Sequence, residues 1–228
     1  MLKKWDDLPP FMKCDEVRVY YNSLRRKRLQ LLAKRGLDYA MAALLLVLFL
    51  IPMLLITVLV AMDSKGPVIF RQTRITSLGK HFVIHKFRTM YTNIQDPHGL
   101  TARRDEGITR LGSFLRRTRL DELPQLYDIL VGHMSFVGTR PEVPEFVACY
   151  SKEMFATMLL PAGITSTASI RFRDEAKYYN DIKENERKII YTEQILPEKM
   201  KDNLNDILHF SIHNDLKIII RTGCCLFE

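Results

Sequence analysis

The longest feature in the hydrophobic pattern is a single apolar run in the first third of the chain. From Tyr39 to Met62 the residues read YAMAALLLVLFLIPMLLITVLVAM, without one charged side chain. At a rise of about 1.5 Å per residue, a helix of this length can cross a hydrocarbon core of roughly 30 Å. The run is too long, and lies too far from the amino terminus, for the apolar part of a cleaved signal peptide. It predicts a membrane-embedded helix.

Pro52 lies near the middle of this run and predicts a break in the helix. Proline removes one backbone donor and crowds the carbonyl of Leu48, four residues earlier. Basic residues flank the run on both sides, whereas a spanning helix normally carries them on its cytoplasmic side. They are Arg25, Arg26, Lys27, Arg28, Lys34 and Arg35 before it, and Lys65, Arg71, Arg74, Lys80, Lys86 and Arg88 after it. This favours a re-entrant helix, broken at Pro52 with both ends at one membrane face, over a simple span, which the sequence leaves open.

The segment before the apolar run has apolar residues at helical spacing among many cations. Residues 17–36 therefore predict a basic amphipathic helix at the membrane interface. Its apolar positions are Val17, Tyr20, Tyr21, Leu24, Leu29 and Leu32. We expect the chain to divide into this N-terminal segment (1–36), a re-entrant membrane helix (37–63) and a cytoplasmic domain (64–228).

The cytoplasmic part combines a short strand pattern with several helical ones. VIFRQTRI and HFVIHKFRTM predict two strands joined by a turn at Gly79, and residues 92–107 are polar and irregular. Helical periodicity covers four further ranges, the second ending at Gly132 and the last at Gly223. These ranges are 108–117, 122–131, 143–158 and 199–222. The expected fold class is α+β, mostly helical, with a small β-hairpin.

Charge and cysteine content narrow the class of partner. The 228 residues include 34 Lys and Arg against 26 Asp and Glu, a formal charge of +8, which favours anionic partners. The four cysteines show no metal or disulfide spacing and are expected to be reduced thiols. No helix-turn-helix, zinc or RNA-binding signature supports a nucleic-acid partner.

The stretch RRTRLDELPQLYDIL places cations directly before two adjacent carboxylates, Asp121 and Glu122. In one interpretation Asp121 caps a helix, with Glu122 and Pro124 in its first turn. In the other, the pair is a chemical site, because two carboxylates suit Mg²⁺ and an ionised Asp can accept a phosphoryl group. Neighbouring arginines and a helix start would both favour the charged form of Asp121. The pattern leaves both interpretations open.

Five ordered blocks resemble the bacterial sugar transferase family, the monotopic polyprenol-phosphate phosphoglycosyl transferases. They are GLDYAMAALLLVLFLIPMLLI, DSKGPVIFRQTR, GKHFVIHKFRTM, LGSFLRRTRLDELPQLYDILVGHMSFVGTRPE and AGIT. The resemblance runs from about residue 35 to the last residues. It implies a re-entrant helix broken at a proline, around a cytoplasmic catalytic domain on the bacterial inner membrane. With no extra amino-terminal membrane domain, we expect the small form of the family.

The resemblance also implies an activity and its residues. A sugar-1-phosphate would pass from a nucleotide diphosphosugar, usually a UDP-sugar, to polyprenol (undecaprenyl) phosphate, releasing UMP and initiating a surface polysaccharide or glycoconjugate. Asp121 would be the nucleophile of a ping-pong reaction, and Glu122, with Asp121, would hold Mg²⁺. The family's basic positions match Lys86, Arg88, Arg116 and Arg140, which are expected to bind the phosphates. Arg116 could instead be a solvated charge, and Arg140 a partner of Glu142 or Glu145.

Some positions depart from the family pattern. Ile51 replaces a common Ser before Pro52, and the remaining changes lie in segments expected to be loops. These are Thr76, Thr139, Ala162 and Ser166. They leave the sugar and the nucleotide base open. The alternative function is a catalytically inactive, membrane-tethered scaffold of a glycan-assembly complex, which would keep the fold without needing Asp121.

Overall fold

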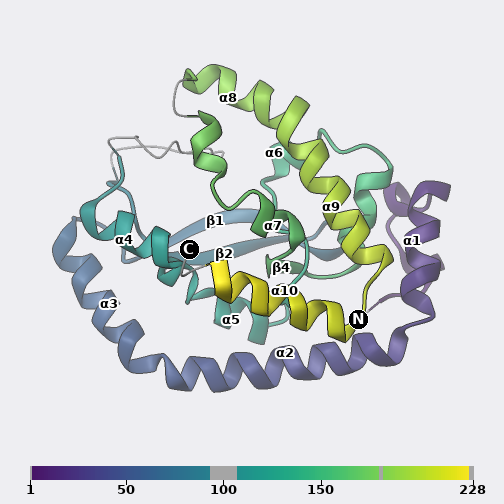
Figure 1. Ribbon diagram of the computed structural model, residues 1–228, viewed down its shortest axis with the longest axis horizontal. Helices are drawn as coiled ribbons and strands as arrows, with labels where there is room; N and C mark the ends of the chain where they lie inside the picture. Colours follow the sequence, from purple (N-terminus) through teal and green to yellow (C-terminus); the bar gives the residue numbers. More distant parts are fainter. Residues whose placement is uncertain (1, 93–106, 180–181, 226–228) are drawn as a thin grey trace.

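The computed structural model describes residues 2–92, 107–179 and 182–225 (Figure 1). Over these residues the chain is α+β and mostly helical, as expected. The helices are α1 (Asp15–Arg25), α2 (Arg28–Leu48), α3 (Leu50–Asp63), α4 (Arg110–Thr118), α5 (Gln125–Leu130), α6 (Pro144–Val147), α7 (Thr167–Arg171), α8 (Glu184–Ile190), α9 (Leu196–Leu208) and α10 (Ile212–Cys225). The strands are β1 (Ile69–Ile75), β2 (His81–Phe87), β3 (Met134–Val137) and β4 (Ala162–Thr165). Most of the irregular segment predicted at 92–107 lies outside the described residues.

The apolar run forms two helices, α2 and α3, with a break between them. The break is centred on Phe49, three residues before Pro52, rather than at the proline itself. Because α3 begins at Leu50, Pro52 falls in its first turn, where a backbone amide needs no helical acceptor. Proline thus ends the preceding helix one turn upstream of its own position.

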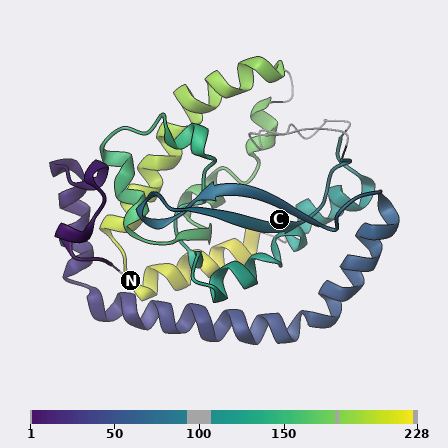
Figure 2. The ribbon, with the colours of Figure 1, turned by 180° about the vertical axis from the view of Figure 1, so that it is seen from behind.

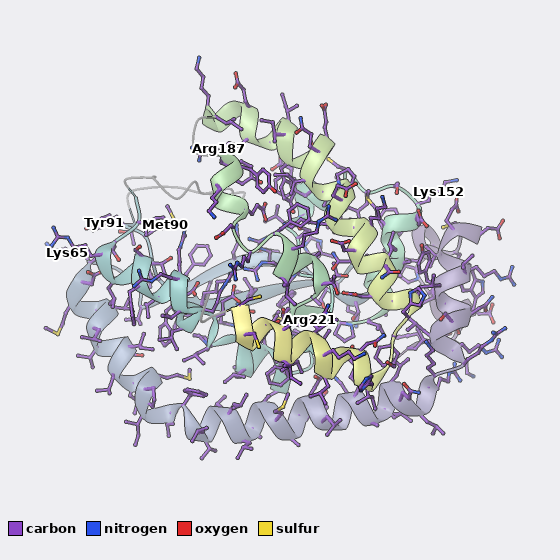
Figure 3. The ribbon with its side chains drawn as sticks, in the orientation of Figure 1. Lys65, Met90, Tyr91, Lys152, Arg187 and Arg221 are labelled. Atoms are coloured by element: carbon purple, nitrogen blue, oxygen red, sulfur yellow. The ribbon has the colours of Figure 1, made fainter. Side chains whose placement is uncertain are left out.

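Helices α2 and α3 together form the long bent edge of the molecule (Figure 1). In the part of the chain that the structure describes, no single helix is both long and apolar enough to cross a bilayer; α2 and α3 reach that length and composition only as a pair bent by 62°. Many of their apolar side chains are exposed and point away from the rest of the chain (Figure 3). These exposed residues are Leu44, Val47, Leu48, Leu50, Ile51, Leu54, Leu55, Val58, Leu59 and Met62.

The predicted amphipathic helix at 17–36 is two helices, because the chain turns at Arg26 and Lys27 between α1 and α2. The apolar face of α1 is covered by η5 (Glu153–Leu159) and α9, so it packs on protein instead of facing a bilayer. Two cations of the predicted basic flank also have internal partners. Lys34 donates to Asp215 at 2.6 Å, and Arg35 donates to the Met134 carbonyl at 2.7 Å.

The predicted hairpin is confirmed. β1 and β2 pair antiparallel, with Ile69 opposite Phe87 and Ile75 opposite His81. The connection contains two residues of positive φ, Leu78 at 61° and Gly79 at 71°. Seen from behind, the hairpin lies across the middle of the molecule (Figure 2).

A second, parallel sheet of β3 and β4 was missed by the hydrophobic pattern. Each strand has four residues, and β3 joins β4 across a long stretch of chain. Gly138, directly after β3, and Gly163, inside β4, make a tight backbone contact. A Cβ on Gly163 would lie 2.1 Å from the Gly138 amide nitrogen. Only glycine fits such an approach.

The helices expected at 143–158 and 199–222 are each interrupted. The first resolves into α6 and the 3₁₀ segment η5, and the second into α9 and α10, which bend apart at residues 209–211. Gly223 does not end the last helix, since α10 continues to Cys225. Within the predicted range 199–222, the apolar residues Leu204 and Ile207 are buried, whereas Leu216 is 52% exposed.

Candidate active site

The carboxylate pair lies in a short 3₁₀ turn, η4 (Leu120–Glu122), between α4 and α5. Arg119 ends α4 in the left-handed region, with φ 58° and ψ 14°, a conformation that non-glycine residues rarely adopt. α5 begins only at Gln125, with Pro124 in the capping position. The interpretation in which Asp121 caps this helix is therefore wrong, because the capping position is Pro124 and no side-chain capping hydrogen bond is made there. The strained turn places both carboxylates ahead of the helix.

Glu122 is the centre of an ion cluster. Its Oε1 accepts from Lys86 Nζ at 2.9 Å and from Arg140 Nη2 at 2.6 Å, and Arg119 Nη1 lies 4.0 Å away. Burial by itself would raise the pKa of this carboxyl, but Arg140, Lys86 and Arg119 outweigh it and hold the pKa well below its usual range. Glu122 therefore stays charged.

Asp121 has different surroundings although it is the adjacent residue. It is also buried, but its Oδ1 has no hydrogen-bond partner among the described residues. Burial, and then the charge of Glu122, raise the pKa of Asp121, while Lys86, Arg119 and Arg116 oppose the rise. The expectation that its surroundings favour the charged form is wrong in direction. Over the described residues, the result is a poorly solvated carboxylate whose Oδ1 has no partner, next to a carboxylate paired with two cations.

Lys86 and Arg140 reach the pair from opposite parts of the chain. Lys86 lies near the end of β2, and burial lowers its pKa to about 8 in spite of the charge of Glu122. Arg140 follows β3. Its segment is held by β1, because Ile75 donates its amide to the Glu142 carbonyl at 2.9 Å and Arg74 donates to the Pro141 carbonyl at 3.2 Å. The predicted alternative partners of Arg140 do not hold: its carboxylate partner is Glu122.

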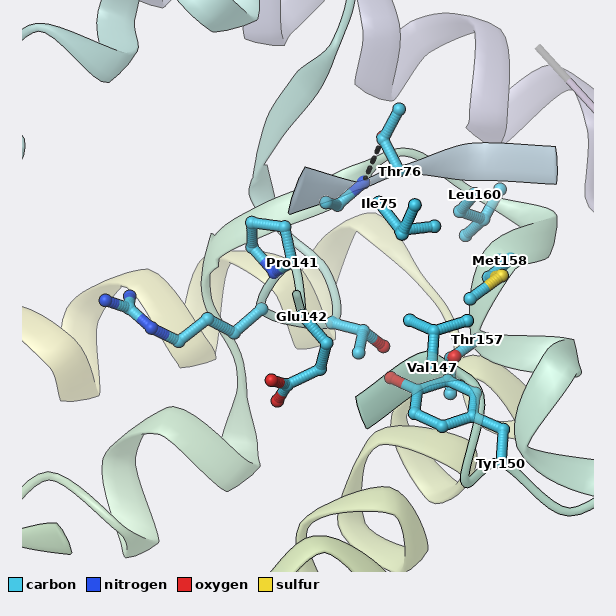
Figure 4. A pocket seen from close by; sticks show the side chains of 12 residues that line it. Ile75, Thr76, Pro141, Glu142, Val147, Tyr150, Thr157, Met158 and Leu160 are labelled. Carbon is cyan, nitrogen blue, oxygen red and sulfur yellow. Dashed lines mark hydrogen bonds between the residues drawn. The ribbon is translucent and has the colours of Figure 1, made fainter. Parts of the chain in front are cut away.

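Glu142, two residues after Arg140, belongs to a neighbouring buried group. Its Oε1 accepts from the hydroxyl of Tyr191, and burial, then the charge of Glu142, raise the pKa of Tyr150 well above its usual value. In Figure 4 the hydroxyl of Tyr150 points toward Glu142 across a small pocket that also borders Arg140. The segment that carries Arg140 is therefore held by the backbone of β1 and, through the Glu142 side chain, by Tyr191.

Of the other two predicted phosphate binders, only Arg116 is near the carboxylates. Its Nε donates to Thr89 Oγ1 at 2.8 Å, and its charge acts on Asp121. Arg88 is used elsewhere. Its guanidinium donates to the carbonyls of Val60, Ser64 and Pro67 and to the Ser64 hydroxyl, closing the end of α3. Arg88 therefore ties the end of α3 to the segment that follows β2.

The donor set fits Mg²⁺ only with help from a substrate. No group of three or more His, Cys, Asp or Glu side chains with metal-site geometry occurs over the described ranges. Two adjacent carboxylates, with Glu122 Oε2 outside the hydrogen bonds to Lys86 and Arg140, match an ion that takes one or two carboxylates and completes its shell with phosphate and water.

Two residues at the site were not assigned from the sequence. Arg119 contributes charge to both carboxylates, and its place beside the pair in RRTRLDE was the available signal. Gln125 is fully buried one turn after Asp121, and neither polar atom of its side chain has a partner among the described residues. Nothing in the pattern marked it out.

This site, a carboxylate pair among cations, suits phosphate-bearing anions. The model of the bacterial sugar transferase family matches residues 29–228, and the chain belongs to that family. The undecaprenyl-phosphate glucose phosphotransferase of Komagataeibacter xylinus is 35% identical over 201 residues, 84% of this chain and 35% of that protein. A UDP-glucose:undecaprenyl-phosphate glucose-1-phosphate transferase of Xanthomonas campestris is 37% identical over 179 residues, 75% of this chain and 34% of that protein.

A third relative is closer to this chain in length. The UDP-glucose:undecaprenyl-phosphate glucose-1-phosphate transferase of Caulobacter vibrioides is 35% identical over 196 residues, 84% of this chain and 68% of that protein. By contrast, the chain spans about a third of the Komagataeibacter and Xanthomonas relatives.

Proposed function

We propose that this protein transfers a sugar-1-phosphate from a UDP-sugar to polyprenol phosphate, releasing UMP. The observation that carries the proposal is the asymmetry of the carboxylate pair. Glu122 is neutralised by Lys86 and Arg140, while Asp121 Oδ1, beside the same cations, has no hydrogen-bond partner among the described residues. The relatives named above as undecaprenyl-phosphate transferases support the choice of substrates.

In the first half of the reaction, Asp121 acts as the nucleophile. Its Oδ1 is enclosed, so the other oxygen, Oδ2, is the one that meets the substrate. Oδ2 forms a bond to the phosphorus that bears the sugar. The bond from that phosphorus to the bridging oxygen breaks, and its electron pair leaves with UMP. Lys86, Arg140 and Arg116 balance the charge of the diphosphate.

In the second half, a phosphate oxygen of polyprenol phosphate attacks the same phosphorus. The bond to Asp121 breaks, and the electron pair returns to the carboxylate. The product is a polyprenol diphosphosugar, and the protein is regenerated for another cycle. Burial of Asp121 disfavours its free, charged carboxylate, and so favours the state in which the carboxylate is bonded to phosphorus and the negative charge lies on the phosphate.

Glu122 and Asp121 would hold Mg²⁺ together with the donor's phosphate oxygens. Bound there, the ion would neutralise negative charge on the diphosphate, as divalent cations do in phosphoryl transfer. Glu122 is suited to this because its Oε2 takes part in none of its hydrogen bonds. Chelation of the metal with EDTA is expected to stop transfer, and added Mg²⁺ to restore it.

We further propose that α2 and α3 enter one leaflet of the bacterial inner membrane and return to its cytoplasmic face. The 62° bend and the exposed apolar side chains of both helices support this arrangement. Arg88 binds the end of α3 through its side chain, and Lys86 of β2, two residues earlier, binds Glu122. These two contacts would then bring the site to the bilayer surface, where a lipid phosphate lies.

Release of UMP by the detergent-purified protein tests this function. The reaction contains Mg²⁺, polyprenol phosphate and one of a panel of UDP-sugars, with reactions lacking lipid or metal as controls. The proposal expects release that needs both and occurs with a restricted set of sugars. Lack of release with every sugar, from folded protein, would contradict it and favour the scaffold alternative.

A further inference from the structure

A buried polar stripe runs from η4 into α5, and the proposed mechanism does not use all of it. Asp121 lies in η4, one turn before Gln125, and Gln125 and Asp128 lie three residues apart on one side of α5. Their exposed fractions are 7%, 0% and 0%. The remaining buried positions of α5, Leu126 and Ile129, are apolar and belong to the core against α2.

The far end of this stripe is satisfied. Asp128 accepts the His85 backbone amide at 3.0 Å and lies 2.8 Å from His85 Nδ1, which fixes α5 along β2. The near end is not satisfied. Gln125 Nε2, Gln125 Oε1 and Asp121 Oδ1 are all enclosed and unpartnered within the described ranges. Gln125 Nε2 is a hydrogen-bond donor and Asp121 Oδ1 an acceptor, and the two residues are one turn apart.

Packing gives no reason for an amide at position 125. A buried amide that lacks hydrogen bonds destabilises a fold, and an apolar side chain of similar volume would remove that penalty. Burial of polar groups without partners is characteristic of sites whose partner arrives during function. The adjacent unpartnered carboxylate is the group that changes during the proposed reaction.

We propose that Gln125 is a positioning residue for Asp121, its Nε2 donating to Oδ1 while the phosphosugar is on the carboxylate. This inference rests on the proposed function. Glutamine has three side-chain torsions, so a rotation brings its amide toward the preceding turn. The hydrogen bond directs Oδ2 outward, toward the substrate.

The hydrogen bond matters most when charge on Asp121 changes. Once Oδ2 is bonded to phosphorus, Oδ1 is a carbonyl oxygen. When polyprenol phosphate displaces the carboxylate, the electron pair of the breaking bond returns and Oδ1 gains negative charge. An N–H aimed at that oxygen stabilises this transition state more than the intermediate, so its loss slows the second half of the reaction. In a ping-pong cycle this lowers kcat, while kcat/KM for the UDP-sugar, which reflects only the first half, stays nearly unchanged.

The test is Gln125→Met in the full chain, which keeps the volume and removes both polar atoms. Gln194→Met, at an exposed glutamine in the π-helical turn η7 (Tyr191–Ile195), is the matched control. Thermal unfolding and steady-state UMP release are measured for both variants. We expect Gln125→Met to unfold at or above the wild-type temperature, with kcat lowered about tenfold or more and kcat/KM for the UDP-sugar within about twofold.

Three results would overturn the inference. One is a kcat within about twofold of wild type, and another is a loss that appears in KM alone. The third is a fall in the unfolding temperature of more than about 4 °C, which would show that protein or a buried water already satisfies the amide. If wild type itself releases no UMP, the proposed function fails, and the unfolding comparison still decides whether the amide is unpaired.

Discussion

At the scale of single residues, the site shows how neighbouring carboxylates acquire different chemistry. Asp121 and Glu122 are both buried, yet the pKa of Glu122 is held low by three cations and that of Asp121 is raised. Two acids whose pKa values are pushed apart can divide the work of a reaction. In the proposed reaction the division is between a charged anchor, Glu122, and a nucleophile, Asp121.

The anchoring role of Glu122 predicts a stability effect. In Glu122→Gln, Lys86 and Arg140 lose the anion that compensates their burial. Breaking a buried ion pair costs about 3–5 kcal/mol, and we expect the lower end because the Arg140 side chain is 33% exposed. Chemical denaturation of the purified protein measures this change in the free energy of unfolding.

The double variant Glu122→Gln/Lys86→Met is the control for this prediction. Removing the lysine charge as well should recover part of the lost stability, because fewer buried cations remain unpaired. Equal stability of Glu122→Gln and wild type would mean that the cluster is solvated, and would contradict the description of Glu122 as an anchor.

At the scale of elements, the contact between Gly138 and Gly163 determines where Arg140 lies. Backbone hydrogen bonds join Gly138 to Thr165 and Gly163 to Thr139, both at 2.9 Å, and Arg140 follows directly. A Cβ at Gly163 would lie 2.1 Å from Gly138 N and 2.3 Å from Gly138 O. The end of the parallel sheet is thus a spacer that brings Arg140 to Glu122.

Gly163→Ala is therefore expected to destabilise the protein by about 1–3 kcal/mol, as overpacking does, and to lower activity by displacing Arg140. The matched control is Gly223→Ala in α10, where a Cβ would meet nothing within 4 Å. That change should be neutral or slightly stabilising, because alanine favours a helix. Thermal unfolding of the two variants compares them. Similar losses in both would contradict the spacer role.

Local patterns predicted some of these elements and missed others for identifiable reasons. The hairpin joins two neighbouring seven-residue strands through a glycine turn. Its sequence signal is therefore local, and the pattern predicted it. β3 and β4 have four residues each and pair across a long stretch of chain, which leaves no periodic signal. The partner of Arg140 was missed for the same reason, since Glu122 lies 18 residues away on another element. The interpretation of Asp121 as a helix cap failed because Arg119 redirects the chain and α5 begins only at Gln125.

At the scale of the whole molecule, the proposed transfer to a lipid depends on how the bent pair of α2 and α3 lies in the membrane. Single cysteines replace Gln30 in α2 or Phe70 in β1, in a chain that lacks its native cysteines. Their labelling reports on which side of the membrane each flank of the helix pair lies. The proposed re-entrant arrangement predicts labelling of both from the cytoplasmic face. Labelling from opposite faces would contradict it.

Pro52→Ala tests the origin of the bend. Without proline, the amide at position 52 can bond the Leu48 carbonyl and α2 can continue into α3. We expect the Phe70 cysteine to become less accessible from the cytoplasmic face in this variant. Unchanged labelling would show that the packing of α3 against α4, together with the contacts of Arg88 with the end of α3, holds the bend without the proline.

The most direct measurement of the central claim is the intact mass of the protein after incubation with Mg²⁺ and a UDP-sugar, without polyprenol phosphate. If Asp121 is the nucleophile, wild type gains the mass of one sugar phosphate, the adduct maps to Asp121, and later addition of polyprenol phosphate removes it. Asp121→Asn should gain nothing. An adduct of equal amount on Asp121→Asn, or UMP released with lipid while no adduct ever forms on wild type, would contradict the account.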